Sequence, residues 1–468
     1  MQNQGMNRGM VDVTPDVRLL RVLRSSGVNL QTAMGEILDN SIDAGASEID
    51  VYVFKNDREK SNIMVVDNGK GMNDVTLRGA FTLAKELKFG IDQIGKYGMG
   101  MKTAALSLST QFEVITQKAS GEVLFGEYNI NKMEQQGEFK TTVRLADEVE
   151  TTLFKSKLRR KQRSGTIVII KNCDRLDTTH PTFVKQMQQF IGLAYKNFIK
   201  RGINFTVSDF PVKGDKVEAI DVLMRENDKT HIISERDTYP IEFETKIGQR
   251  KNTFIEVSST VLPKPDKGSK GKKIDGKDVQ LPLNQTHQGI YVYREGRMVG
   301  QGLSWVNVFG EKHNEKNRFR IEINCNSELD DAVNMNFLKG NVNPINTLKN
   351  QLAEIIEPYM EEMREVLRQE EEKEMTVQTS RDTSVDKKVT RKIEMVINKP
   401  ISSQVEKEEK VSEKVIRNKN VKKAKSKKEL LVAAKEIRAV LESKRTSEKT
   451  KKEFMEALGL TYSVPVTV

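Results

Sequence analysis

The sequence predicts an α+β protein with two successive α/β regions and a charged tail. Segments rich in valine and isoleucine, which are typical of strands, alternate with segments whose apolar residues recur at helical spacing. This alternation stops at about residue 367, where the composition changes to Glu, Lys, Ser, Thr and Val. A length of 468 residues is sufficient for two or three domains.

The first region, residues 14–208, is expected to be a mixed α/β layer. Residues 1–13 should form a flexible arm, and Pro15 suits the first turn of a short helix that runs through Leu23. Further helices are expected at 30–44 and 183–200. Strands are expected at 50–54, 63–66, 112–116, 122–128, 140–145 and 165–170.

The second region, residues 209–367, contains fewer clear strands. They are expected at 241–245, 253–261, 289–294 and 319–324. Residues 263–277 (PKPDKGSKGKKIDGK) lack apolar periodicity, which predicts a mobile basic loop. A helix with apolar residues at helical spacing from Leu348 to Met363 ends the region, and Pro358 is a position where it could kink.

The tail, residues 368–468, is predicted to be largely disordered, because it is highly charged and has no aromatic residue before Phe454. A lysine-rich amphipathic helix is nevertheless expected near 428–442. Its apolar stripe consists of Leu430, Ala434, Ile437 and Leu441. The stripe either docks a protein partner or belongs to a helix that forms only transiently.

Charge and cysteine usage restrict the class of protein. The net charge of +11 and the pI near 9.2 favour an anionic partner such as nucleic acid, although a basic tail can also be simply solvated. Cys173 and Cys325 are far apart, which argues against a disulfide framework or a zinc site. Because the sequence lacks a signal core and a membrane-length apolar run, we expect a soluble intracellular protein, cytoplasmic or associated with nucleus or nucleoid.

A first motif, GEILDNSIDAGA at residues 35–46, combines a helical period with polar residues on one face. Glu36 and Asn40 lie one turn apart, opposite the apolar side. A carboxylate there can polarise a water molecule, and an amide oxygen can bind a hard cation such as Mg²⁺. The alternative is an ordinary amphipathic helix with a solvated polar face.

A second motif, IMVVDNGKGM at residues 63–72, is a strand that runs into a glycine-containing turn. Asp67 at the strand end could accept a hydrogen bond from an exocyclic amine, and the glycines would let the backbone approach a flat base. The alternative is a plain hairpin turn, because Asn-Gly after an apolar run is a common hairpin signal.

A third motif, GKYGMGMKT at residues 95–103, precedes an apolar helix. Such a glycine loop offers backbone N–H groups to phosphate. It is not a Walker A loop, because Met101 separates Gly100 from Lys102, and the third glycine of a dinucleotide fingerprint is missing. The alternative is a flexible loop without a ligand.

Together, within about seventy residues, the three motifs resemble the nucleotide-binding motifs of the GHKL superfamily (gyrase, heat-shock chaperone, histidine kinase, MutL). They are most similar to the MutL and Microrchidia (MORC)-like branch and its bacterial relatives. The resemblance extends from residue 17 to about 208, is weaker in the next region and does not include the tail. It implies a Bergerat-fold α/β sandwich with helices on one face, followed by a ribosomal-protein-like transducer domain.

The resemblance also implies ATP hydrolysis with Mg²⁺ and assigns roles to residues. Glu36 would be the general base, Asn40 would coordinate Mg²⁺, and Asp67 would bind the adenine amine. Gly71 and Thr166 would support Asp67. The lid over the phosphates would consist of Gly95, Gly98, Gly100 and Met101, with Lys102 nearby.

A further lysine is implied by the segment ELDDAVNMNFLKG at residues 328–340. In the superfamily the transducer domain sends a lysine to the γ-phosphate, and Lys339 is the candidate. A lysine there would distinguish ATP from ADP and stabilise developing charge. The alternative is an ordinary surface lysine.

Several branches of the superfamily do not fit. No histidine precedes the first motif, which argues against a sensor kinase, and the tail lacks the length and composition of a DNA-cleavage or metal-binding domain. The favoured function is an ATP-gated homodimeric clamp on DNA, in which the arm at 1–13 swaps between protomers. The loop at 263–277 and the tail at 415–452 would contact phosphates without sequence specificity. A chaperone-like clamp on protein clients, and a regulatory or defence ATPase whose tail recruits a partner, remain alternatives.

Overall fold

The computed structural model describes seven stretches of the chain, and residues 377–397 only as backbone. The stretches are 15–25, 28–83, 100–158, 163–212, 214–245, 248–334 and 342–397. Met1–Glu372 form one compact unit and Lys373–Val468 another. The predicted arm at 1–13 and the predicted helix near 428–442 lie outside the described residues.

The first sheet has, among the described residues, eight strands in the order β5-β4-β3-β6-β2-β1-β7-β8. They are β1 (Glu48–Lys55), β2 (Ser61–Asp67), β3 (Gln111–Gln117), β4 (Leu124–Asn129), β5 (Thr142–Leu145), β6 (Gly165–Lys171), β7 (Asn204–Asp209) and β8 (Asp215–Lys216). The sheet is mixed, because β1 pairs in parallel with β7 and antiparallel with β2. The expected mixed α/β architecture of the first region is therefore confirmed.

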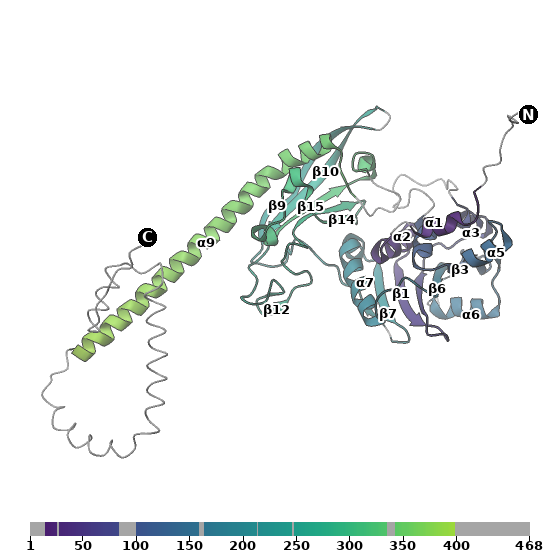
Figure 1. Cartoon of the computed structure of the whole chain (residues 1–468), viewed down its shortest axis with the longest axis horizontal. Coiled ribbons are helices and arrows are strands. Elements are labelled where there is room, and N and C mark those ends of the chain that lie inside the picture. Colours follow the sequence, from purple (N-terminus) through teal and green to yellow (C-terminus); the bar gives the residue numbers. More distant parts are fainter. Residues whose placement is uncertain are drawn as a thin grey trace, which may run out of the picture. The chain divides into compact units, whose positions relative to one another are not determined.

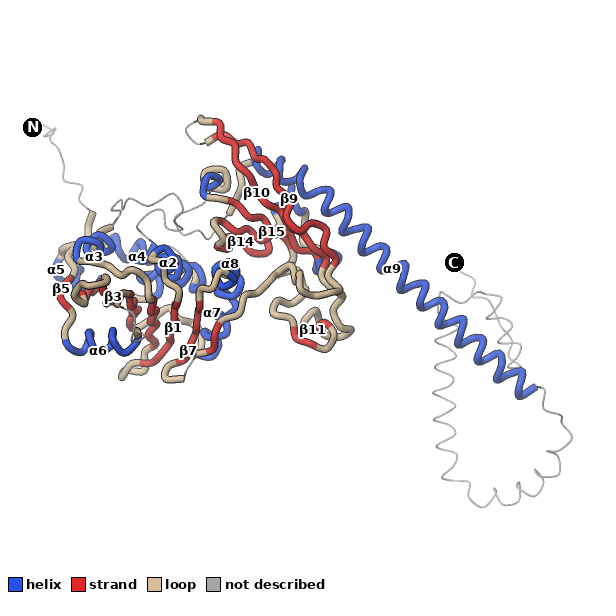
Figure 2. Tube along the Cα trace, turned by 180° about the vertical axis from the view of Figure 1, so that it is seen from behind, coloured by secondary structure: helices blue, strands red, loops and turns tan. Residues whose placement is uncertain are grey.

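Helices cover both faces of this sheet. We call the sheet and these helices the first lobe. The helices are α1 (Leu19–Arg24), α2 (Leu30–Asp43), α3 (Asp74–Phe81), α4 (Gly100–Leu108), α5 (Ile130–Gln136), α6 (Glu148–Lys157), α7 (His180–Ala194) and α8 (Lys196–Lys200). The largest apolar core joins one face of the sheet to α2, α4 and α7. Phe154 of α6 packs on the other face against Met64 and Val66 (Figures 1 and 2). The expectation of helices on one face only was wrong. Consecutive residues of β2 are apolar and buried, so this strand presents apolar side chains to both faces of the sheet.

A second sheet has the order β14-β13-β15-β10-β9 within the described residues. Its strands are β9 (His231–Glu244), β10 (Arg250–Val261), β13 (Gly289–Arg294), β14 (Arg297–Leu303) and β15 (Phe319–Cys325). Short helical turns follow at Trp305–Phe309, Asn314–Arg318 and Ser327–Asp330. Helix α9 (Asn346–Ile397) buries Leu348, Leu352, Ile356 and Met360 in the core beside this sheet. We call this sheet, its turns and the start of α9 the second lobe.

The basic loop at 263–277 is more structured than its composition predicts. It contains β11 (Lys273–Ile274), which pairs antiparallel with β12 (Lys277–Asp278). Ile274 packs there in a small apolar cluster with Leu262 and Leu283. The apolar residues are too sparse to show a period in the sequence, although they are enough to fix a short hairpin.

Helix α9 does not end near residue 367, where the composition predicts the start of a disordered tail. It passes through Pro358 and continues to Ile397. Glutamate, lysine and arginine favour helix, and Arg368 pairs with Glu365 at 2.8 Å and with Glu372 at 3.7 Å along the helix surface. Charge-rich composition was therefore a poor indicator of disorder in this segment.

The two lobes share a buried contact. Tyr291, Tyr293 and Met298 of β13 and β14 belong to the apolar core of the first lobe. Lys196 of α8 is buried, forms an ion pair with Glu322 of β15 and lies 3.5 Å from Asp221. Strands β13, β14 and β15 of the second lobe therefore pack against the first lobe.

Candidate active site

Helix α2 carries the first group of candidate residues. Asn29 caps it by accepting a hydrogen bond from the Thr32 N–H at 2.8 Å, so the helix starts at a defined residue. Glu36 is buried, with 4% of its surface exposed, whereas Asn40 one turn later is exposed. The two side chains thus lie on one helix face that passes from the interior to the surface, as the spacing predicts.

The Glu36 carboxyl group lies against the start of α4. A β carbon at Gly100 would overlap the Glu36 Oε2 atom, so only glycine allows this approach. Gly100 is also the first residue of α4, where backbone N–H groups lack partners within the helix. The structure therefore brings Glu36 next to the end of the glycine motif, although the two are 64 positions apart in the sequence.

Asp67 lies at the end of β2 in a buried hydrogen-bond network. Its carboxylate accepts hydrogen bonds from the Ser41 hydroxyl at 3.1 Å and from the Gly69 N–H at 2.9 Å. Burial raises the pKa of Asp67 to about 6, and hydrogen bonds from Gly69, Ser41 and Thr166 oppose that rise. Asp67 is thus held in a fixed orientation as an acceptor at neutral pH.

Thr166 lies directly beside Asp67, because the two residues are paired between β2 and β6. Its hydroxyl is 3.0 Å from the Thr116 hydroxyl, which accepts a hydrogen bond from the Met72 N–H at 3.0 Å. Gly71 has φ +62°, and a β carbon there would overlap the Gln117 carbonyl oxygen. The turn after Asp67 is therefore pressed closely against β3, as a backbone that approaches a flat ligand requires.

The lid is described only at its end. Gly95, Gly98 and the lysine candidate Lys339 lie outside the described residues. Gly100 and Met101 form the start of α4, and the Lys102 ammonium donates a hydrogen bond to the Ala80 carbonyl at 2.7 Å. Burial lowers the pKa of Lys102 to about 8. Lys102 thus contacts the end of α3, and its place beside the lid stays a prediction, because Gly95 and Gly98 lie outside the described residues.

A buried group behind the site was not predicted from the sequence. Asp39 of α2 accepts a hydrogen bond from the Tyr195 hydroxyl at 2.7 Å and pairs with Arg297 of β14, also at 2.7 Å. Gly35 leaves room for this arginine, because a β carbon there would overlap the Arg297 guanidinium. The only signal in the sequence was the glycine before Glu36, and it does not reveal its partner.

The described residues fit a nucleotide better than a site that binds a metal ion through protein ligands alone. No cluster of three or more His, Cys, Asp and Glu side chains that could hold a metal occurs in the described part of the chain. Asn40 can supply one oxygen ligand, and Mg²⁺ commonly takes most of its other ligands from phosphates and water. The arrangement places an oriented hydrogen-bond acceptor at Asp67 and a buried carboxylate at Glu36.

Comparison with known proteins identifies the class. Residues 28–166 match the family described as histidine kinase-, DNA gyrase B-, and HSP90-like ATPase. This segment contains Glu36, Asn40, Asp67 and Thr166, so the resemblance seen in the motifs is confirmed: the chain carries a GHKL-type ATPase domain.

Individual relatives lie on the MORC and MutL side of the superfamily. The chain is 32% identical over 90 residues to ATPase MORC2B of Mus musculus, which is 18% of this chain and 9% of that protein. It is 35% identical over 91 residues to Protein MICRORCHIDIA 5 of Arabidopsis thaliana, which is 18% of this chain and 13% of that protein. It is 32% identical over 102 residues to DNA mismatch repair protein MutL of Phocaeicola vulgatus, which is 19% of this chain and 16% of that protein.

These similarities extend over a small part of each relative, from 9% to 16% of its length. The family match, at residues 28–166, lies within the first lobe. Of the helices in the described part of the chain, none is both long and apolar enough to cross a bilayer.

Proposed function

We propose that the first lobe binds ATP with Mg²⁺ and hydrolyses it, and that hydrolysis switches a dimeric clamp that acts on DNA. One observation supports this most: a buried, oriented carboxylate at Asp67 and a buried carboxylate at Glu36 occur on adjacent elements of a GHKL-type domain. Neither carboxylate is needed to build a core, because burial of a charged group destabilises the fold unless the group is compensated.

The adenine would bind at Asp67. Its oxygen accepts a hydrogen bond from the exocyclic amine, while Ser41 and Gly69 hold the carboxylate in place. The tight turn at Gly71 and the Thr166 hydroxyl would form the walls beside the base. The carbonyl that guanine carries in place of the amine cannot donate a hydrogen bond, so this contact selects adenine over guanine.

The phosphates would lie between Asn40 and the start of α4. Mg²⁺, when bound, neutralises phosphate charge, and Asn40 would be its protein ligand. Glu36 accepts the proton of the attacking water as general base, and its contact with Gly100 holds it near the phosphate-binding helix end. Lys339 would reach the γ-phosphate from the second lobe and stabilise the charge that develops there.

A route for the signal follows from the buried pair behind α2. Arg297 of the second lobe contacts Asp39, which is adjacent in sequence to the proposed Mg²⁺ ligand Asn40. Displacement of α2 when nucleotide binds would be transmitted to β14 through this contact. Hydrolysis would then act as a signal between two lobes, as expected of a switch.

DNA is the favoured target because the chain has a basic loop and because one of its relatives is named for an action on DNA. One relative is named a DNA mismatch repair protein. On the basic loop, Lys267, Lys270 and Lys272 are exposed, and such lysines suit non-specific phosphate contacts. A chaperone-like clamp on protein clients, and a regulatory or defence ATPase whose tail recruits a partner, are the other candidates, and they require no DNA contact.

Light scattering with and without a non-hydrolysable ATP analogue, repeated with plasmid DNA, tests this proposal. We expect a homodimer with the analogue and DNA retention that decreases with salt. The triple change of Lys267, Lys270 and Lys272 to Gln removes three of the six lysines of the loop, and deletion of residues 398–468 removes tail charge without cutting α9. Unchanged DNA binding in the combined variant would refute these contacts, and no DNA binding at ~50 mM salt would favour the two alternatives.

A further inference from the structure

Buried arginines in the described part of the chain are neutralised by aspartate, with one exception. Arg24, Arg294 and Arg297 each form an ion pair, with Asp174, Asp330 and Asp39 respectively. Arg320 of β15 is the most deeply buried of the four, with 1% of its surface exposed, and it forms no ion pair with a described residue. A buried cation without a counter-charge is costly, so this exception needs an explanation.

The hydrogen bonds of Arg320 do not use its full capacity. Its Nη1 atom donates to the carbonyls of Asn317 and Phe319, both at 2.9 Å, while its Nη2 atom has no partner among the described residues. Burial lowers the pKa of Arg320, and the neighbouring Tyr291 opposes that effect. The buried Nη2 nitrogen therefore has hydrogen-bonding capacity that no described residue fills.

Nearby carboxylates are engaged elsewhere. Glu322 lies two residues along the same strand and forms a buried ion pair with Lys196. Asp221 lies 3.5 Å from Lys196 and 3.8 Å from Arg225. Burial lowers the pKa of the nearby His287 and Lys312, and the Arg320 charge lowers both further.

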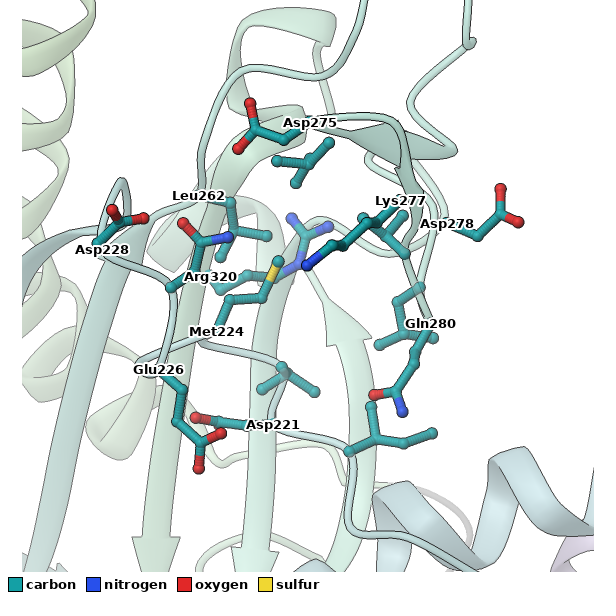
Figure 3. Close-up of a pocket in the computed structure, with 16 residues that line it drawn as sticks. Asp221, Met224, Glu226, Asp228, Leu262, Asp275, Lys277, Asp278, Gln280 and Arg320 are labelled. Atoms are coloured by element: carbon teal, nitrogen blue, oxygen red, sulfur yellow. The ribbon is translucent and has the colours of Figure 1, made fainter.

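Arg320 lines a cavity of about 530 Å³ between β11, β12 and the segment that precedes β9. In Figure 3 its guanidinium and the Lys277 amine both point into this cavity. The walls are largely apolar and consist of Ile220, Val222, Met224, Leu262, Ile274, Val279 and Leu281. The volume lies within the range of small-molecule sites in proteins, about 300–1,000 Å³.

The rim restricts the charge of a ligand. Asp221, Glu226, Asp228, Asp275 and Asp278 line the cavity as well, and in Figure 3 Glu226 and Asp278 point away from the guanidinium. Asp275 pairs with Lys229 at 2.7 Å, and Asp278 lies 3.9 Å from Lys273. A rim with this many carboxylates disfavours a multiply charged phosphate and tolerates a single negative charge that reaches the arginine.

We propose that this cavity is a binding site for a small organic monocarboxylate. The carboxylate binds the Nη2 nitrogen of the Arg320 guanidinium, with Lys277 as a second cation, and the apolar part of the ligand packs against the aliphatic walls. None of the proposed nucleotide-binding residues lines this cavity, so the test of carboxylate binding does not depend on the proposed ATPase activity.

Isothermal titration of the full chain without nucleotide tests the site, with 4-methylpentanoate, its uncharged amide and inorganic phosphate as probes. We expect the acid to bind at least about 10-fold more tightly than the amide or phosphate, because the charge-assisted bond is lost in the amide. Arg320→Gln should abolish binding of the acid. Lys277→Met, an exposed position that does not threaten the fold, should weaken it about 10-fold.

Lys272→Met is the matched control, because it removes an exposed lysine of the same loop that does not line the cavity. It should change the affinity for the acid by less than about 2-fold. Equal binding of acid and amide, tighter binding of phosphate, retention of binding in both Arg320→Gln and Lys277→Met, or no binding of any probe would each overturn the proposal.

Discussion

The Arg297 Nε atom lies 2.7 Å from the Asp39 Oδ1 atom and joins β14 of the second lobe to the helix that carries Glu36 and Asn40. Both side chains are almost fully buried, with 4% and 1% of their surfaces exposed, and Tyr195 donates a hydrogen bond to the same aspartate oxygen. The Arg297 charge therefore compensates a carboxylate that could not otherwise be buried there.

Arg297→Met should destabilise the protein by about 3–5 kcal/mol, because it leaves Asp39 buried without a counter-charge. Urea unfolding followed by circular dichroism measures the change. Arg18→Met is the control, since the Arg18–Asp16 pair is exposed and its loss should have little effect. Equal stability of the two variants would show that the buried pair does not hold the lobes together.

Gly100→Ala should lower the rate of ATP hydrolysis by about 10-fold or more while nucleotide affinity persists. The added methyl group would displace the Glu36 carboxyl from the start of α4, and small displacements of a reacting group have large effects on rate. Steady-state turnover and binding of a fluorescent ATP analogue measure the two quantities. Gly121→Ala, at an exposed turn, should leave both unchanged.

ATP affinity should fall as the pH decreases through about 6, because Asp67 then becomes protonated and no longer serves as a full acceptor for the adenine amine. The midpoint of a pH titration of ATP binding measures this. Asp67→Asn should bind ATP weakly and show no such midpoint. A wild-type affinity that is constant between pH 5 and about 7 would contradict the role of Asp67.

The same carboxyl group affects stability with the opposite sign. Its pKa is higher in the folded state, about 6, than the ordinary value of 3.8, so the folded state binds more protons between these values. The free energy of unfolding without nucleotide should therefore fall as the pH rises from about 4 to about 6, by on the order of 1–3 kcal/mol. Asp67→Asn should lack this component in the pH dependence of urea unfolding.

The sequence predicted most of the first sheet, because β-branched runs such as residues 165–170 are buried on both faces. It did not predict α6, in which Phe154 is the one buried side chain, although Asp147 and Glu150 form a capping box at its start. The prediction for β9 began ten residues late, at residue 241 rather than His231, because most of the earlier side chains are exposed. Exposed elements carry little apolar periodicity, which is the signal that the prediction uses.

The same limit applies to the site. Glu36, Asn40, Asp67 and Thr166 could be selected because short motifs place them on one helix and on strand ends. Arg297 and Tyr195 could not, because their partners lie far away in the sequence and only the packing of the two lobes brings them together. Arg320 likewise resembles any other arginine in a strand until its burial is known.

Lys339→Ala should reduce the hydrolysis rate by about 10²-fold if this lysine stabilises charge on the γ-phosphate. Its effect on ADP affinity should be small, because ADP lacks that phosphate. Lys267→Ala, at an exposed position in the basic loop, is the control and should leave the rate unchanged. A wild-type rate in Lys339→Ala would identify Lys339 as an ordinary surface lysine.

The hydrolysis of ATP by Glu36→Gln, compared with its ATP binding, tests the central claim most directly. The change removes the general base and keeps the size of a side chain that is 4% exposed. We predict undiminished binding of ATP, turnover at least about 10²-fold slower than in the wild type, and accumulation of an ATP-bound dimer on light scattering. Turnover within about 2-fold of the wild type, with binding intact, would contradict the proposed role of Glu36 and with it the account of this site.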